Sequence, residues 1–166
     1  MKNLDDFTDF EDGERNGWEN DIGSLDGVLK TEEGPAGPNT FWSGKLEWRP
    51  THTFMPSLAK MFTLPGGEQA KGNLETSFKY RVHPPEPGEA TEISVTVTDN
   101  VSLGHNSFFI DQHTPHGKWL HSSKITFPYS GTRAHVLIGT RGVDGTAVSR
   151  KIDIDDIKVV QVPDKK

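Results

Sequence analysis

Cysteine is absent from this chain of 166 residues. A disulfide framework, a thiolate nucleophile and a zinc site built on cysteine are therefore excluded. Apolar runs approaching the roughly 18 residues of a transmembrane helix are also absent, so we expect no membrane span. Residues 1–6 lack the apolar stretch of a secretory signal peptide, and the residues themselves leave the compartment open.

The chain also lacks an excess of basic residues. Its formal net charge is −6, and residues 1–33 hold eleven acidic and three basic side chains. Because a protein that binds nucleic acid normally presents a basic face, we expect no nucleic-acid partner. The acidic N-terminal segment is either a solvated edge or a source of carboxylates for a cation.

Short apolar alternations separated by turns occupy most of the chain. Seventeen glycines and eleven prolines mark the turns, and no window has a persuasive helical period. Alternation with period two predicts strands at residues 7–10, 58–62, 77–82, 93–98, 124–128, 134–139 and 152–159. We therefore predict one all-β domain over residues 1–166, with a core of about 7–162. Eight to ten strands would form a two-sheet antiparallel β-sandwich.

Two irregular segments stand out against this pattern. Asp155 and Asp156 shift the apolar register of the last predicted strand by one residue, which predicts a β-bulge. Residues 34–56 are rich in proline, tryptophan and polar side chains and are predicted to form a long loop. Long loops in compact domains often carry function.

Three local patterns together resemble a known family. They are Phe10-Glu11-Asp12-Gly13 followed by Gly17-Trp18, then Gly117-Lys118-Trp119, and finally Ile154-Asp155-Asp156-Ile157. In this order they look like the jelly-roll carbohydrate-binding modules of bacterial polysaccharide-degrading enzymes, which have a galactose-binding-like fold. The resemblance implies a lectin-like, non-catalytic domain whose partner is a polysaccharide or another glycan.

The first and third patterns also resemble MAM domains, which are extracellular adhesion modules. This second resemblance implies an alternative function, the binding of a protein partner at a cell surface. Either resemblance favours a secreted or cell-surface location. Fold alone does not decide between the two functions.

The resemblance to carbohydrate-binding modules further implies a structural calcium ion between the first and last strands. It places Glu11 and Asp155 at the matching positions, with Asp156 beside them. Ca²⁺ takes about six to eight oxygen ligands, which carboxylates and turn carbonyls can supply. The alternative is that these residues are ordinary edge acids.

The predicted loop at 34–56 contains the first candidates for ligand binding. Trp42 and Trp48 lie there with Arg49 and His52. A flat indole face matches the apolar C–H face of a pyranose, and neighbouring arginine or histidine can bond its hydroxyls. We predict that these four residues contact a glycan. The alternative is that both rings fill the end of the sandwich.

Further candidates come from other parts of the chain. Arg81 lies on the outward face of the strand at 77–82, and Arg141 lies in the glycine-rich segment after the strand at 134–139. Trp18, Tyr80 and Trp119 are predicted to be core or core-edge residues. No nucleophile motif, phosphate loop or dinucleotide fingerprint is present, so we predict that the protein is not an enzyme.

Overall fold

Two antiparallel sheets make up the computed structural model, which describes residues 2–99, 107–142 and 144–165. Its strands are β1 (Asp5–Thr8), β2 (Glu19–Asn20), β3 (Val28–Gly34), β4 (Gly37–Trp48), β5 (Met55–Thr63), β6 (Lys71–Arg81), β7 (Ile93–Thr98), β8 (Ser107–Ile110), β9 (Leu120–His121), β10 (Ile125–Ser130), β11 (Arg133–Thr140) and β12 (Val148–Pro163). Across these described ranges, no helix is long and apolar enough to cross a membrane.

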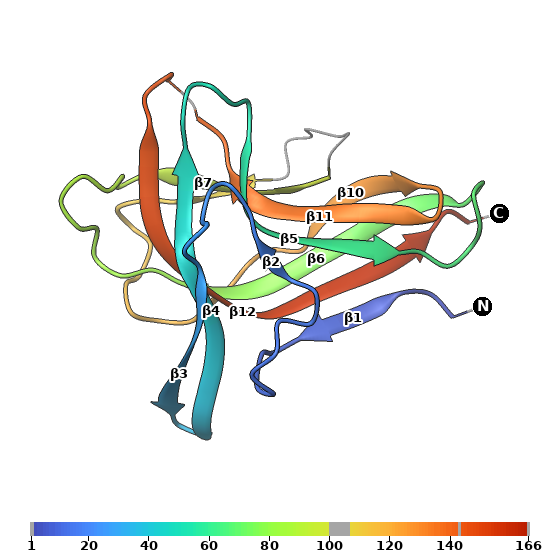
Figure 1. The fold of residues 1–166 in the computed structure, drawn as a ribbon, viewed down its shortest axis with the longest axis horizontal. Coiled ribbons are helices and arrows are strands. Elements are labelled where there is room, and N and C mark those ends of the chain that lie inside the picture. The colour runs from blue at the N-terminus through green and yellow to red at the C-terminus, as the bar shows by residue number, and fades with distance from the viewer. Residues whose placement is uncertain (1, 100–106, 143, 166) are drawn as a thin grey trace.

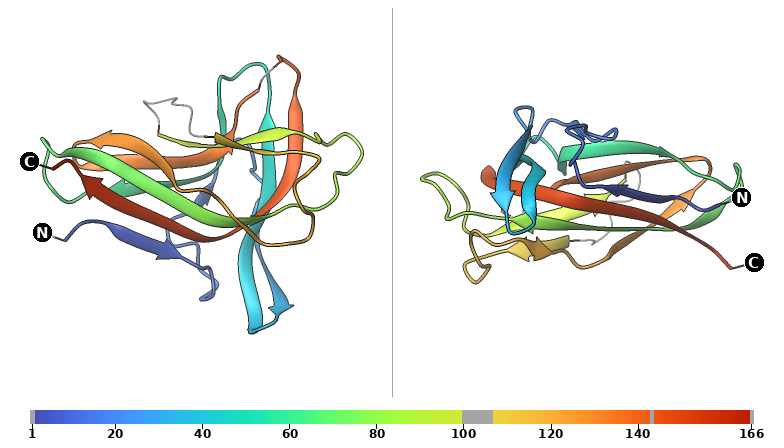
Figure 2. Two further views of the ribbon diagram at one scale, coloured as in Figure 1. Left: turned by 180° about the vertical axis from the view of Figure 1, so that it is seen from behind. Right: turned by 90° about the horizontal axis from the view of Figure 1, so that it is seen from below.

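The two sheets differ in size. The larger has seven strands in the order β10-β6-β12-β4-β3, with β1 paired to β12 and β9 paired to β6. The smaller has the order β2-β5-β11-β7-β8. Figures 1 and 2 show the sheets as two layers, with both termini at the same end. The predicted all-β, two-sheet antiparallel sandwich is confirmed.

Alternation along each strand decides which side chains enter the core. In β6, Phe78 and Tyr80 point inward and are buried, while Lys79 between them is partly exposed. Trp18 is also fully buried, next to Phe62. The core positions predicted for Tyr80 and Trp18 are therefore confirmed.

The bulge predicted at Asp155 and Asp156 is present. The pairing of β12 with β6 shifts register between Asp155 and Lys158, and Asp156 has a φ of 48°. Before the bulge β12 pairs with β4, and after it β12 pairs with β1. The bulge therefore lies where the first strand of the chain meets the last.

The prediction of a long loop at residues 34–56 is wrong, because β4 occupies most of that range. Trp42, Leu46 and Trp48 alternate as a strand requires, but Gly44 interrupts the apolar pattern. A Cβ atom at Gly44 would lie 2.4 Å from Ser24 Oγ, so packing requires glycine there. The expected count of eight to ten strands is also too low, since the described residues form twelve.

Candidate functional site

Trp42 and Trp48, the first predicted ligand contacts, are not exposed. Trp42 is 0% exposed and Trp48 is 6% exposed, and both lie in β4. The Trp42 indole donates a hydrogen bond to Asn20 at 2.9 Å, and the Trp48 indole donates one to the main-chain oxygen of His52 at 2.9 Å. The prediction that these rings form an open stacking surface is therefore wrong: they support the sandwich.

The other predicted contacts separate into two regions. Arg49 and His52 are exposed in the turn between β4 and β5, under which Trp48 packs. Arg141 follows β11, where its main-chain N–H donates to Ser94 of β7 at 3.4 Å. Arg81 lies on β6 in the other sheet.

Around Arg81 the structure forms a groove, which we call the Trp119 groove. It has a volume of about 450 Å³ and lies between the β3–β4 hairpin, the strands β6 and β12, and the segment before β9. In Figures 1 and 2 this hairpin projects from the body of the sandwich. The polar and aromatic side chains that line the groove are Glu32, Glu33, Asn39, Lys79, Arg81, Trp119, Asp155 and Asp156.

Charged partners hold the Arg81 guanidinium from two sides. Its Nη1 and Nη2 donate to the two oxygens of Glu32 at 2.6 and 3.1 Å, and its Nε donates to Asp153 Oδ2 at 3.0 Å. The same oxygen of Asp153 lies 3.1 Å from Nε2 of His83. Glu32 belongs to β3, so Arg81 ties the projecting hairpin to the centre of the sheet.

Two aromatic rings also contact this guanidinium. The Cζ atom of Arg81 lies 4.5 Å from the ring centroid of Trp119 and 4.8 Å from that of Phe41. The two rings meet edge to face at 5.3 Å. Phe41 is buried, whereas Trp119 stays partly exposed and lines the groove. The core-edge position predicted for Trp119 is thus correct, but its place in the groove was missed.

The part of the groove that β12 contributes is acidic. Lys79 Nζ pairs with Asp156 Oδ2 at 2.9 Å, and this contact raises the pKa of Lys79. Burial raises the pKa of Asp155 to about 7, the charges of Asp156 and Glu11 add to the rise, and hydrogen bonds from the Asp156 N–H and from Asn39 oppose it. Since Asp155 is 3% exposed, the carboxylate that this part of the groove presents to solvent is that of Asp156.

The predicted metal ligands are only partly brought together. Glu11 accepts a hydrogen bond from the Thr40 N–H at 2.8 Å and lies close enough to Asp155 to raise its pKa. Asp156 instead pairs with Lys79. Within the described ranges, no three His, Cys, Asp or Glu side chains are grouped to hold a metal. Glu11 and Asp155 could hold Ca²⁺ only together with main-chain carbonyls and water.

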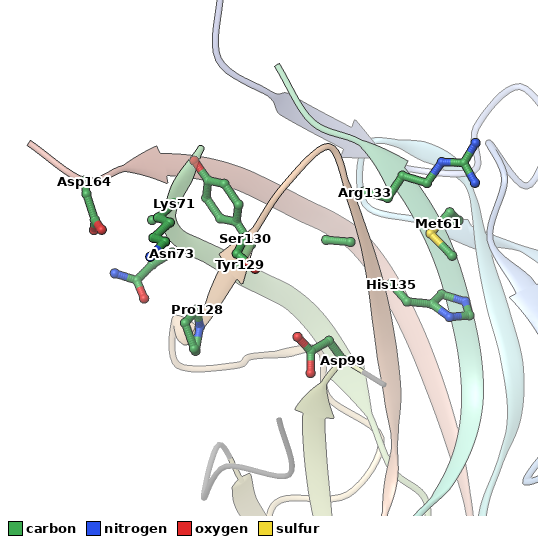
Figure 3. A pocket seen from close by; sticks show the side chains of 12 residues that line it. Met61, Lys71, Asn73, Asp99, Pro128, Tyr129, Ser130, Arg133, His135 and Asp164 are labelled. Carbon is green, nitrogen blue, oxygen red and sulfur yellow. The ribbon is translucent and has the colours of Figure 1, made fainter. Parts of the chain in front are cut away.

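A larger cavity, of about 580 Å³, lies between β6, β10 and β11. Figure 3 shows that its charged side chains do not converge. Arg133 and His135 on β11 point away from Lys71 and Asn73 on β6. The Trp119 groove, whose polar groups are linked to one another, is therefore the better defined site.

Comparisons with known proteins agree with the fold. No family model matches the chain, and no curated protein matches it. The xylan-binding domain CBM22-1 of Paenibacillus barcinonensis Xyn10C is similar over 96% of this chain and 94% of that chain, with a TM-score of 0.57 and 16% identity. CBM27-1 of Caldicellulosiruptor saccharolyticus, solved with mannohexaose, is similar over 93% and 96%, with a TM-score of 0.53 and 12% identity.

A third similar structure contains the CBM22-1 and GH10 modules of Clostridium thermocellum xylanase 10B with xylohexaose. It matches 99% of this chain and 29% of that chain, with a TM-score of 0.51 and 13% identity. These similarities show that the chain has the jelly-roll β-sandwich fold of carbohydrate-binding modules. The resemblance to MAM adhesion modules has no support among these structures and stays a prediction.

Proposed function

We propose that the chain is a non-catalytic module that binds a polysaccharide in the Trp119 groove. One observation carries the proposal: a partly exposed indole, fixed against a guanidinium, lines the same groove as the polar side chains of Asn39 and Asp156. The fold supports it, because similar structures are a xylan-binding domain and modules solved with mannohexaose and xylohexaose. No step that breaks a bond is part of the proposal.

The groove matches the two surfaces of a sugar ring. A pyranose has an apolar C–H face and an edge of hydroxyl groups. Trp119 offers apolar surface, while Asn39 and Asp156 offer acceptors and one amide donor. A volume of about 450 Å³ falls within the range of about 300–1,000 Å³ that is usual for ligand sites.

Preorganisation strengthens this argument. Arg81 and Phe41 already hold the Trp119 ring, so binding would lose little side-chain freedom there. Arg81 is therefore proposed as a positioning residue for Trp119. Because Arg81 and Lys79 are both engaged in ion pairs within an acidic groove, a neutral, hydroxyl-rich ligand fits better than an anionic one.

Affinity electrophoresis in gels containing xylan, glucomannan or a pectic polysaccharide tests the proposal. We expect retardation by at least one of the neutral polymers and none by the pectic one. Trp119→Ala should weaken binding by roughly 30-fold, the effect of losing about 2 kcal/mol at a binding hot spot. Phe7→Ala is the matched control, because Phe7 is an exposed aromatic outside the groove. Equal retardation of the Trp119→Ala and Phe7→Ala proteins would exclude the groove.

A structural Ca²⁺ ion between Glu11 and Asp155 is the second part of the proposal. Two carboxylates lie near each other, and the buried one has a raised pKa, so a cation would relieve both repulsion and burial. The ion would connect the turn after β1 with the bulge of β12. Its contribution would be to stability.

Thermal unfolding with and without a chelator tests this ion. The melting temperature should fall in chelator and recover on addition of CaCl₂, and Asp155→Ala should remove that response. Asp12→Ala is the control, since Asp12 is an exposed acid in the same turn. A wild-type melting temperature that is unchanged by chelator would exclude the calcium ion.

A further inference from the structure

A further pocket lies mainly on the five-stranded sheet, beside β7 and β8, and we call it the Phe109 pocket. It has a volume of about 290 Å³. Its lining residues come from β7, from β8, from the start of β12 and from the segments before β7 and between β11 and β12, and they are Glu92, Ile93, Ser94, Phe109, Arg141, Asp144 and Val148. None of these residues lines the Trp119 groove. We infer that this pocket is a second saccharide-binding site, which takes one or two sugar units of a chain.

Strand pairing places Phe109 at this pocket. Phe108 turns inward, where its ring lies 4.9 Å from that of Tyr80, so the next side chain must point outward. The Phe109 side chain is accordingly exposed, at 54%. It lies directly opposite Ser94 in the pairing of β7 with β8, within the close distance of a cross-strand pair.

Hydrogen bonds hold Arg141 beside the same position. The Ser94 hydroxyl contacts the Thr140 hydroxyl at 3.2 Å and both the N–H and the carbonyl of Arg141 at 3.4 Å. Gly142 then lies flat on Trp48, since a Cβ atom there would be 2.1 Å from the indole. Trp48, which the sequence suggested as a ligand contact, thus supports this pocket from below.

A buried arginine fixes the segment that precedes Glu92. Arg150 is 1% exposed and donates to the carbonyls of His83, Ala90 and Thr91 at 2.9 to 3.2 Å. These bonds position the segment that leads to Glu92, an acid of the pocket wall. The pocket therefore rests on fixed main chain on both sides.

The chemistry of the pocket fits a sugar. The exposed ring of Phe109 and the partly buried side chain of Val148 adjoin one guanidinium and the carboxylates of Glu92 and Asp144. Such a mixture of apolar surface and convergent polar groups is typical of small-ligand sites. A volume of about 290 Å³ suits a shorter segment than the groove would hold.

That the ligand of the Phe109 pocket is a saccharide rests on the proposed function, whereas the place of the pocket in the fold does not. The two sites share no lining residue, so one molecule could bind two polysaccharide chains or two segments of one chain. Linked sites of this kind raise the apparent affinity for a polymer by about 10²–10⁴-fold without any new contact. Binding to insoluble polysaccharide should then be far tighter than binding to a soluble hexasaccharide.

Chemical-shift mapping of amide resonances during titration with xylohexaose and mannohexaose tests the inference. We expect two separate groups of shifted residues, one at the Trp119 groove and one around Ser94, Phe109 and Arg141. Phe109→Ala should remove only the second group and lower retention on insoluble polysaccharide at least 10-fold. Phe109→Trp should keep both effects, and Phe7→Ala is again the control for an exposed aromatic.

The outcomes separate the two proposals. Shifts confined to the groove, with Phe109→Ala unchanged in retention, would overturn the second site and leave the groove supported. Shifts confined to the Phe109 pocket would support the second site and overturn the groove. No shift with either hexasaccharide at millimolar concentration would overturn both as sites for these β-linked sugars.

Discussion

Replacing Arg81 by methionine tests the ion network on which the Trp119 groove depends. Methionine keeps much of the apolar stem and removes the guanidinium. Asp153, whose side chain is 7% exposed, would lose its 3.0 Å partner and keep only the half-exposed His83 at 3.1 Å. Removal of one member of a buried ion pair costs about 3–5 kcal/mol. Because His83 and water can partly compensate, we expect the free energy of unfolding to fall by about 3 kcal/mol.

The other lost contacts add less. The Glu32 side chain is 37% exposed, so its part of the network contributes at most about 1 kcal/mol. The ring contacts with Phe41 and Trp119 contribute on the order of 1 kcal/mol, and the methionine stem replaces part of that. Urea denaturation followed by tryptophan fluorescence measures the total.

Lys79→Met is the matched control. Lys79 lies two residues earlier on the same strand, and its pair with Asp156 is much more exposed, at 38% and 26%. Its loss should cost less than about 1 kcal/mol. The double variant Arg81→Met/Asp153→Asn should recover part of the stability, because it leaves no unpaired buried charge. If Arg81→Met costs no more than Lys79→Met, the network is not a buried one and the reasoning is refuted.

Three further predictions concern Asp155, Gly44 and Gly142. In chelator, the raised pKa of Asp155 means that the folded state binds its proton more tightly than the unfolded state does. The stabilising contribution of this proton is complete below about pH 4 and is lost as the pH rises through about 7. The melting temperature should therefore fall more between these pH values in the wild type than in Asp155→Asn. An equal fall of the melting temperature in both proteins would contradict this. Gly44→Ala should cost about 1–3 kcal/mol in urea denaturation, because the added methyl group meets Ser24 and Trp42, and a neutral effect would show that this contact relaxes freely. Gly142→Ala should lift its segment off Trp48 and weaken retention on insoluble polysaccharide, while shifts at the Trp119 groove persist; unchanged retention would contradict that role.

The fold could be predicted because alternation survives in the central strands. The segment 93–98 coincides with β7, and the register change at Asp155 marks a real bulge. Both signals are local, since each depends on side chains within a few residues of one another. The strand β4 was missed because Gly44 breaks its alternation for a reason that only distant packing explains.

The site could be predicted only in fragments. Arg81 and Asp155 were identified from outward phase and from family resemblance, and both line the Trp119 groove. The prediction that Trp42 is exposed was wrong, because an indole in a polar, proline-rich segment can enter the core when the segment is a strand. The partnership of Arg81 with Glu32 joins residues 49 positions apart and has no local signal.

A crystal structure of the chain grown with saturating mannohexaose or xylohexaose tests the central claim most directly. We expect a saccharide in the Trp119 groove, with a ring against Trp119 and hydroxyls within hydrogen-bond distance of Asn39 or Asp156. A saccharide bound elsewhere, with the Trp119 groove empty at the same concentration, would contradict it.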